Sequence, residues 1–344
     1  MSIKKGAPPV NINNRKLING TEADVIQLYP MRHKFAWEYY LNGNANHWLP
    51  TEISMQLDIE QWKSPTILSA DERQAFETIL GFFTSADSIA ANNIVIGFYK
   101  HVTSPEVRMY LLRQAYEESI HTWAYQYIVE SLGMDEGRIF NMYREVETIY
   151  DKAEFILTFN EGIFDGTFKT GDFAADQKFL ENWCVFSLIL EGIFFYSAFA
   201  VVLGFKRQNK LTGSAEQIEY IMRDESNHLN FGIEVIQTIK EENPDLWTRD
   251  FQDKIVNHIR QATKLEYTFA QTVFPKGIFG LTSDGFKQYI EHIADRRLER
   301  VGLPAQFGTA NPFGWMSEVA DLSKKKNFFE TRVTEYQTGG NLNW

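Results

Sequence analysis

Residues 183–205 form an almost wholly apolar segment whose single charged side chain, Glu191, lies near its middle. The segment is long enough to cross a bilayer, but an isolated carboxylate is costly at that depth in lipid. A helix that is hydrophobic all round can instead form the centre of a large soluble bundle. We favour the bundle because we find no second segment of this kind and because the rest of the chain has the pattern of amphipathic helices.

Helix start signals divide the rest of the chain. Residues 69–72 match a capping box at the start of a long helix. Ser104 followed by Pro105 predicts a second helix start. We expect one further helix over residues 135–159 and another that opens with a capping box at residues 214–217. No stretch alternates convincingly with period two, so the predicted fold is an all-α bundle of long helices.

The chain is expected to have three regions. Residues 1–60 have the pattern of an irregular N-terminal arm with a short helix, and residues 61–310 that of the helical domain. Residues 311–344 have the pattern of a flexible C-terminal tail, which ends in a polar, glycine-rich run and Trp344. That composition suits a mobile segment with an aromatic docking anchor.

Charge and cysteine usage exclude some functions. The formal net charge is −11, which is unlike the basic surface of a nucleic-acid binder. The single cysteine, Cys184, lies in an apolar run and allows no internal disulfide, so we expect a chain from the reducing cytoplasm. The N-terminus lacks the apolar stretch of a signal peptide.

Two Glu-x-x-His pairs are the main chemical signal. Each pair places a carboxylate and an imidazole on one face of a helix, which suits a first-row divalent metal. A single such pair is weak, because a surface Glu–His pair is often just solvated. Here two further carboxylates are interleaved with the pairs, as a two-metal helical bundle requires. The predicted ligands are Asp87, Glu118, His121, Glu191, Glu225 and His228.

Tyr125 lies four residues after His121, one turn along the same helix face. It can be an ordinary core tyrosine, since the chain has 15 tyrosines. It can also be a redox-active phenol that is oxidised by the metals, and its shielding and local polarity would then be set by the protein.

The metal-helix segments resemble those of class I ribonucleotide reductase small subunits. The similarity covers residues 87–89, 118–125, 190–196, 223–228 and, in the tail, 327–336, in the family's order. It runs from about Trp48 to Trp344, most of the chain. The resemblance implies a ferritin-like bundle that holds a two-metal carboxylate site in its core.

The resemblance also implies roles for single residues. Tyr125 would hold a stable radical, and its apolar pocket would be formed by Phe195, Phe199 and Ile221. Trp48 and Asp224 match a chain that runs from His121 toward the surface, and Asp224 can accept the second ring N–H of that histidine. Tyr336 matches a tail tyrosine that passes the radical onward.

The family's reaction follows as an expectation. An oxygen species would activate the metals, and the radical from Tyr125 would pass to a separate large (alpha) subunit. That subunit would reduce ribonucleotides to deoxyribonucleotides for DNA replication. This chain would be active only with that partner, because it lacks a P-loop and a reducing cysteine pair. We expect a homodimer whose tail docks on the large subunit, with an activating flavoprotein as a further candidate partner.

The metals are expected to be two irons per chain, with manganese–iron or dimanganese pairs as alternatives. The chlamydial type of this family has phenylalanine at the radical position and glutamate as first ligand, so Tyr125 and Asp87 favour a tyrosyl radical and iron. Gln114 stands where some relatives have tryptophan. Two other functions stay open, a stand-alone ferritin-like oxidase or oxygenase and a metal-storage bundle. The oxidase would not explain Trp48, Asp224, Tyr125 and Tyr336 together, and a bound lipid or substrate channel would support it. Measured assembly size would separate the storage bundle from the expected homodimer.

Overall fold

The computed structural model describes residue 6 and residues 11–21 and 25–316, and within them the protein is all-α. Its only extended pairings in these residues are two isolated bridges, Ile18 with Val102 and Ile278 with Leu281. The longer helices are α1 (Lys34–Ala45), α2 (Gln56–Lys63), α3 (Ala70–Asn92), α4 (Pro105–Leu132), α5 (Glu136–Glu145), α6 (Glu147–Asn160), α7 (Phe173–Cys184), α8 (Phe195–Arg207), α9 (Thr212–Glu242), α10 (Arg249–Val273) and α11 (Ser283–Arg300). Two π-helices, η3 (Asn93–Phe98) and η4 (Val185–Phe194), continue α3 and α7 without a break. Short 3₁₀ turns are η1 (Ile12–Asn14), η2 (Pro50–Glu52) and η5 (Pro244–Leu246).

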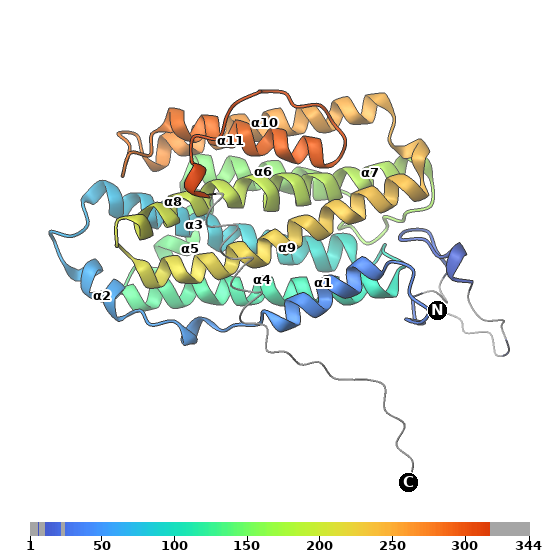
Figure 1. Ribbon diagram of the computed structural model, residues 1–344, viewed down its shortest axis with the longest axis horizontal. Helices are drawn as coiled ribbons and strands as arrows, with labels where there is room; N and C mark the ends of the chain where they lie inside the picture. Colours follow the sequence, from blue (N-terminus) through green and yellow to red (C-terminus); the bar gives the residue numbers. More distant parts are fainter. Residues whose placement is uncertain (1–5, 7–10, 22–24, 317–344) are drawn as a thin grey trace, which may run out of the picture.

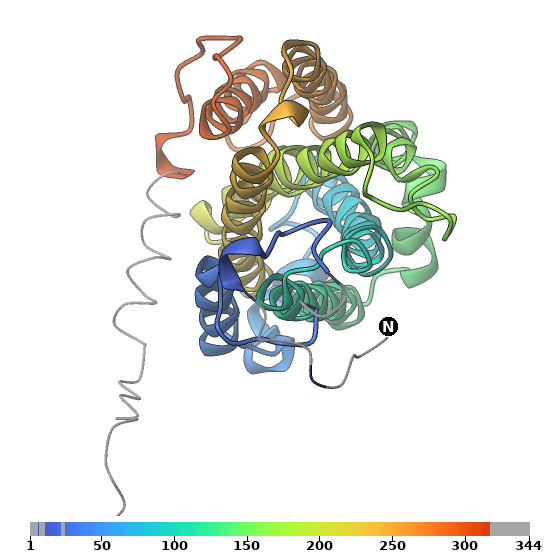
Figure 2. The same ribbon diagram turned by 90° about the vertical axis from the view of Figure 1, so that its right-hand side faces the viewer.

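Four long elements enclose the centre of the molecule. Helices α3 and α4 pack side by side, and the continuous rod of α7, η4 and α8 packs with α9. Figure 1 shows these rods running roughly along the long axis, with α10 and α11 together at one edge. Figure 2 looks nearly along the rods and shows them grouped around a common centre. Helix α1 lies against α4 and α9 on the opposite edge from α10 and α11. This is the predicted ferritin-like bundle.

The predicted starts of α3 and α4 are confirmed. Ser69 accepts a hydrogen bond from the Glu72 backbone, and the Glu72 side chain accepts one from the Ser69 backbone. Ser104 caps α4, with Pro105 at its first position. Both caps satisfy backbone N–H groups that a helix start leaves without partners.

Two other helix predictions were wrong. Residues 135–159 form two helices, because Val146 adopts an extended conformation (φ −101°, ψ 106°) that ends α5 and begins α6. Helix α9 begins at Thr212, so Ser214 lies inside it and does not cap it. Asp58 of α2 takes the capping role, since its carboxylate accepts hydrogen bonds from the backbone N–H groups of Gly213 and Ser214. A cap from a distant segment leaves no local sequence signal.

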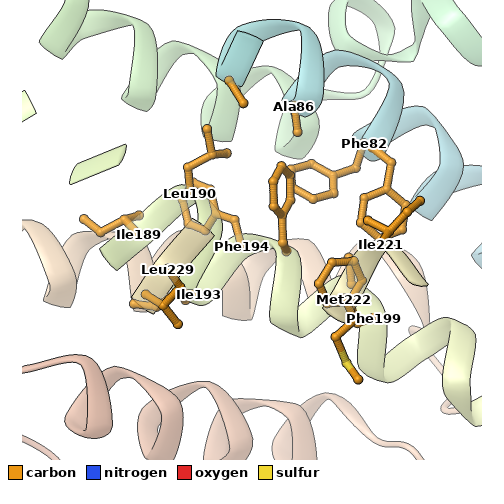
Figure 3. Close-up of a cluster of buried hydrophobic side chains, with 14 of the residues drawn as sticks. Phe82, Ala86, Ile189, Leu190, Ile193, Phe194, Phe199, Ile221, Met222 and Leu229 are labelled. Carbon is orange, nitrogen blue, oxygen red and sulfur yellow. The ribbon is translucent and has the colours of Figure 1, made fainter. Parts of the chain in front are cut away.

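The apolar segment is the central rod of the bundle. In the helical stretch Phe173–Arg207, 94% of the most apolar window is buried inside the protein, as predicted for a core helix. A second stretch, Ala70–Phe98, also meets the length and hydropathy of a membrane span, so the expectation of a single such segment was wrong. It is 61% buried and forms the opposite wall of the same core. Figure 3 shows the apolar contact between these walls, with Phe82 and Ala86 facing Leu190 and Phe194.

Candidate metal centre

The six predicted ligands come together at the centre of the bundle. They are supplied by α3 (Asp87), α4 (Glu118, His121), η4 (Glu191) and α9 (Glu225, His228). All six have 0% exposure. The ligand atoms fall into two groups, each within 4.8 Å: Glu118, Glu191, Glu225 and His228 form one, and Asp87, Glu118 and His121 form the other. The arrangement is that of two adjacent ion sites that share Glu118.

Glu118 and Glu225 each extend between the two histidines. Oε2 of Glu118 lies 3.4 Å from Nδ1 of His121, and its Oε1 lies 3.2 Å from Nδ1 of His228. Glu225 repeats this with Oε1 at 3.2 Å from His121 and Oε2 at 3.2 Å from His228. Each carboxylate thus presents one oxygen to each side of the cluster, which is the geometry needed to bridge two ions.

The buried polar atoms of the cluster fit a pair of divalent ions. Both carboxylate oxygens of Asp87 and of Glu118, one oxygen each of Glu191 and Glu225, and Nδ1 of His121 have no hydrogen-bond partner among the described residues. Buried charges without partners are costly, and metal coordination is one of the few arrangements that compensates them. The four carboxylates together carry the charge that two divalent cations would neutralise.

In the absence of a metal, burial and neighbouring charges shift the pKa values of the cluster. Burial and the neighbouring Glu118 carboxylate raise the pKa of Asp87, and burial raises the pKa of Glu191. Burial lowers the pKa of His121, but the surrounding carboxylates of Asp224, Glu118 and Glu225 outweigh it and raise that pKa above its usual value. Without a metal, Asp87, Glu191 and His121 therefore favour their protonated forms.

A hydrogen-bonded chain leads from His121 to Trp48, as the resemblance implied. Nε2 of His121 lies 3.4 Å from Oδ2 of Asp224, and the Trp48 indole N–H donates to the same oxygen at 2.8 Å. Arg223 donates to the other oxygen of Asp224. The Trp48 ring stacks on Tyr220 with centroids 5.4 Å apart. This chain holds His121 with Nδ1 toward the cluster.

Glu117 forms the equivalent contact on the other side, and sequence reasoning missed it. Its Oε2 lies 2.8 Å from Nε2 of His228, and its Oε1 accepts a hydrogen bond from Arg113 at 3.0 Å. A signal was present in the sequence, because an acidic residue directly precedes the glutamate of both Glu-x-x-His pairs. Glu117 and Asp224 are those two residues, and each one faces the histidine of the opposite helix.

Gln114 is one turn before Glu118 on α4 and contacts the cluster directly. Its side-chain amide donates to Oε1 of Glu191 at 2.6 Å. This hydrogen bond orients Glu191 and leaves its second oxygen toward the cluster. The indole N–H of a tryptophan at position 114 could not donate from the place of the Gln114 amide. Glutamine at this position therefore changes the hydrogen bonding of Glu191.

Tyr125 is fully buried beside the cluster, and its hydroxyl faces the Asp87 carboxylate without a well-formed hydrogen bond. Burial and the Asp87 carboxylate raise the pKa of this phenol well above 10. Its ring stacks on Phe83 with centroids 5.1 Å apart and an angle of 5° between the planes. Phe83 in turn contacts Phe195 and Phe199.

Phe195 and Phe199 were expected to line the Tyr125 pocket, and both contact its stacking partner Phe83. Sequence reasoning missed Phe83. The third expected pocket residue, Ile221, is fully buried and lies beside Phe199 in the same apolar cluster (Figure 3). Nothing in the sequence distinguishes Phe83 from the other 26 phenylalanines except its position four residues before Asp87. The remaining predicted site residues, Tyr336 and Trp344, lie outside the described residues.

Comparison with known proteins points to one family. The family model described as "Ribonucleotide reductase, small chain" matches residues 25–312. The chain is 52% identical over 335 residues to the ribonucleoside-diphosphate reductase subunit beta of Chlamydia pneumoniae, covering 97% of this chain and 96% of that one. It is 31% identical to a ribonucleoside-diphosphate reductase small chain of Plasmodium falciparum, covering 95% and 87%. Among solved structures, the ribonucleotide reductase R2 subunit from Clostridium botulinum matches with a TM-score of 0.80 and 27% identity, covering 89% and 94%.

The chain is therefore 52% identical to a chlamydial protein, although Tyr125 and Asp87 differ from the residues expected of the chlamydial type. Overall similarity does not decide which metals are bound. That question depends on the ligand set and on the surroundings of Tyr125.

Proposed function

We infer the function of this chain from one premise: it belongs to the ribonucleotide reductase small-chain family. It is the small subunit of ribonucleoside-diphosphate reductase, an oxidoreductase that works together with a large subunit. A stand-alone oxidase of the same fold is not favoured, because both sequence relatives and the solved structure are reductase subunits. The buried carboxylate and histidine cluster is suited to a pair of metal ions.

At the level of residues, we propose that Asp87, Glu118 and His121 hold one ion and that Glu191, Glu225 and His228 hold the other. The two-sided placement of Glu118 and Glu225 supports a bridging role for both. We propose two irons as the working pair, with manganese–iron and dimanganese pairs as the alternatives, because the same oxygen and nitrogen ligands suit all three. When bound and activated by an oxygen species, the ions supply the oxidising equivalent.

Tyr125 is proposed as the group that stores this equivalent as a radical. Its hydroxyl is buried beside Asp87, which can receive the phenolic proton when the ring is oxidised. Phe83 covers the ring face, and Phe195, Phe199 and Ile221 exclude water from its surroundings. Exclusion of water prevents side reactions of a reactive intermediate.

Trp48, Asp224 and His121 are proposed as the exit route for the radical. The supporting contacts are the hydrogen bond between Trp48 and Asp224 and the approach of Asp224 to His121. Tyr336, on the tail, is proposed as the next carrier. In this proposal residues 1–60 form the arm, 61–310 the metal-binding domain, and 311–344 the tail that docks on the large subunit.

We also propose a cytoplasmic homodimer. Leu112, Tyr116 and Trp123 are exposed by 55%, 44% and 38%, and their spacing places them along one outward face of α4. A stripe of large exposed apolar side chains is typical of an interface between protein chains. The buried, disulfide-free Cys184 is consistent with a reducing compartment. An activating flavoprotein remains a candidate additional partner.

The test is electron paramagnetic resonance of the protein loaded anaerobically with Fe(II) and then exposed to oxygen, with Y125F as the control. We expect an organic radical that is absent from Y125F. Two bound irons per chain without a radical at Tyr125 would contradict the assignment under iron and oxygen. The same measurement with manganese and with mixed metals would then decide between the alternatives. Loss of ribonucleotide reduction without the large subunit, and its recovery on addition of that subunit, tests the partnership.

A further inference from the structure

A pocket of about 320 Å³ lies on the outer side of the bundle, where α11 crosses α8 and α9. One wall is basic and comes from α11, with Arg296, Arg297 and Arg300. The facing wall comes from α9 and is mixed, with the apolar Met222 and Leu229 beside the polar Ser226 and Asn230. The volume is at the lower end of the range of small-molecule sites.

The three arginines lack acidic partners. In the part of the chain that the structure describes, none of them forms an ion pair with a carboxylate. Some helical arginines of this protein are paired with acids, as Arg113 is with Glu117 and Arg249 with Asp253, and others such as Arg73 donate to backbone carbonyls. Three clustered cations without acids are unexpected in a chain with a net charge of −11.

Arg297 is the most constrained of the three, because its side chain is only 8% exposed. Its Nε donates to the carbonyl of Gly192 at 2.8 Å, and its guanidinium carbon lies 4.8 Å from the centre of the Tyr196 ring. Burial lowers the pKa of Arg297, and the nearby Arg296 and Arg300 lower it further. Arginine nevertheless stays protonated in proteins. The Gly192 carbonyl and the Tyr196 ring compensate part of this buried charge, and an anion in the pocket would compensate the rest.

The exposed arginines also favour an anion. Arg296 and Arg300 are four residues apart on α11, a spacing at which like charges repel. Among the described residues, the Arg300 guanidinium donates one hydrogen bond, to Oδ1 of Asn230 at 3.1 Å. An anion between the three guanidinium groups would relieve the repulsion and accept several charge-assisted hydrogen bonds.

We propose that this arginine pocket binds a phosphate group, as free phosphate or as the phosphomonoester of a small metabolite. The rigid donor fork of arginine matches phosphate oxygens, and a doubly charged anion suits three cations better than a single carboxylate does. Met222 and Leu229 of α9 offer an apolar contact for an organic part of the ligand. The pocket is separate from the metal-binding cluster, although Gly192, which Arg297 contacts, is the residue next to Glu191.

The experiment is isothermal titration calorimetry on the full-length, metal-free chain, since phosphate also binds iron. The probes are inorganic phosphate, adenosine monophosphate and adenosine. The test variant is R296Q/R300Q, which leaves the buried Arg297 in place. The matched control is R249Q/R260Q, which removes the same charge from another pocket where Arg249 is already paired with Asp253. A thermal unfolding curve of each variant shows that the fold is retained.

We expect saturable binding to one site per chain, weakened about tenfold or more in R296Q/R300Q and unchanged in the control. Tighter binding of adenosine monophosphate than of phosphate identifies a phosphomonoester, and equal binding identifies free phosphate. The proposal is overturned if neither binds with a dissociation constant below about 1 mM. It is also overturned if both double variants lose affinity equally, or if adenosine binds as well as its monophosphate.

One further variant tests whether the chain fills the pocket itself. Met316 is at the rim of the pocket, and Glu318 and Asp321 follow it in the sequence. If phosphate binds only to E318Q/D321N, the chain's own carboxylates are the occupant and the phosphate site is rejected. Equal binding by this variant and the unmodified chain supports the proposal.

Discussion

Glu117 of α4 contacts Nε2 of His228 on α9 at 2.8 Å, and Asp224 of α9 contacts Nε2 of His121 on α4 at 3.4 Å. The two contacts are reciprocal across the metal-binding cluster. Each helix thus supplies a metal-binding histidine and also the carboxylate that orients the histidine of the other helix. Such outer contacts fix the ring and raise the basicity of the coordinating nitrogen.

Glu117→Gln is expected to weaken metal binding at the His228 side by about 10- to 100-fold, because it removes the charge that supports the imidazole. The affinity is measured by competition with a chromophoric chelator under anaerobic conditions. Glu130→Gln, an exposed change on the same helix, is the control, since Glu130 only accepts a hydrogen bond from Gln126. Equal affinities of E117Q and E130Q would show that Glu117 has no such role.

Tyr125→Phe is expected to leave the stability of the metal-free protein unchanged or slightly increased. The Tyr125 hydroxyl is buried beside the Asp87 carboxylate without a well-formed hydrogen bond, so its removal costs little and relieves desolvation. Tyr196→Phe is the comparison, because that hydroxyl is hydrogen-bonded to Ser226 at 2.6 Å. Its loss is expected to cost about 0.5–1.5 kcal/mol. Urea unfolding of both variants measures the change in the free energy of unfolding. A clear destabilisation by Y125F would mean that the Tyr125 hydroxyl forms a stabilising hydrogen bond.

Trp48→Phe is expected to retain the radical at Tyr125 but to lose nucleotide reduction with the large subunit. Phenylalanine has no N–H to donate to Asp224 and is much harder to oxidise, so the proposed exit route is interrupted. Trp62→Phe controls for loss of an indole elsewhere, since the half-buried Trp62 packs on Phe76. Radical content is measured by paramagnetic resonance and turnover by product formation. Full turnover in W48F would eliminate Trp48 from the route.

The metal-free protein is expected to lose stability as the pH rises from the acidic range, above the unfolded pKa values of the buried cluster, through its raised folded pKa values. The raised pKa values of His121, His228, Asp87 and Glu191 mean that the folded state binds protons more tightly than the unfolded state does. Their stabilisation is present at low pH and is lost as the pH passes through the folded pKa values. The lowered pKa values of Glu118 and Asp224 act in the opposite direction, but only around the usual carboxylate range.

Metal binding should reverse this trend, because cations replace the bound protons and bind more tightly as the pH rises. Urea unfolding with chelator and with saturating metal, at both ends of the range, measures the difference. A free energy of unfolding that rises with pH in the chelated protein would contradict the assigned proton binding.

Lys152→Met is expected to destabilise the protein by about 3–5 kcal/mol, because it leaves the buried Glu266 carboxylate without its cation. Lys152 forms an ion pair with Glu266 and lies 3.4 Å above the Phe82 ring. Burial lowers the pKa of Lys152 to about 8, and Glu266 opposes that change. The double variant K152M/E266Q should recover much of the loss, since glutamine can still accept the hydrogen bond from Ser197. Chemical unfolding distinguishes the two, and a double variant as unstable as K152M would point to packing instead of charge.

Much of the metal centre could be predicted because it depends on spacing within single helices. Residues three apart in a helix lie on the same face. This places Glu118 beside His121 and Glu225 beside His228. Glu191 was identifiable because one carboxylate in an apolar segment needs a compensating partner. The structure brings all six predicted ligands together. The helix starts at Ser69 and Ser104 were predictable for the same reason, since their caps are local.

The features that could not be predicted depend on contacts between distant segments. Asp58 caps α9 from α2, and no pattern near Thr212 indicates it. Phe83 was missed because many phenylalanines fill this core, and only packing decides which one stacks on Tyr125. Helices α5 and α6 on either side of the extended Val146 both pack on α3, which is a contact between segments distant in the chain.

The sequence by itself determined which residues can bind metal and their order along the chain. It also determined the helical bundle that carries them, because helix periodicity and the hydrophobic pattern follow from residue type. The tertiary structure alone decided how the helices face one another. It turned Glu118 and Glu225 toward both histidines, paired Glu117 with His228, and left three arginines of α11 around a pocket without acids. The physical reason is that relative helix placement is set by side-chain packing over the whole core, and it is this placement that brings together groups far apart in the chain.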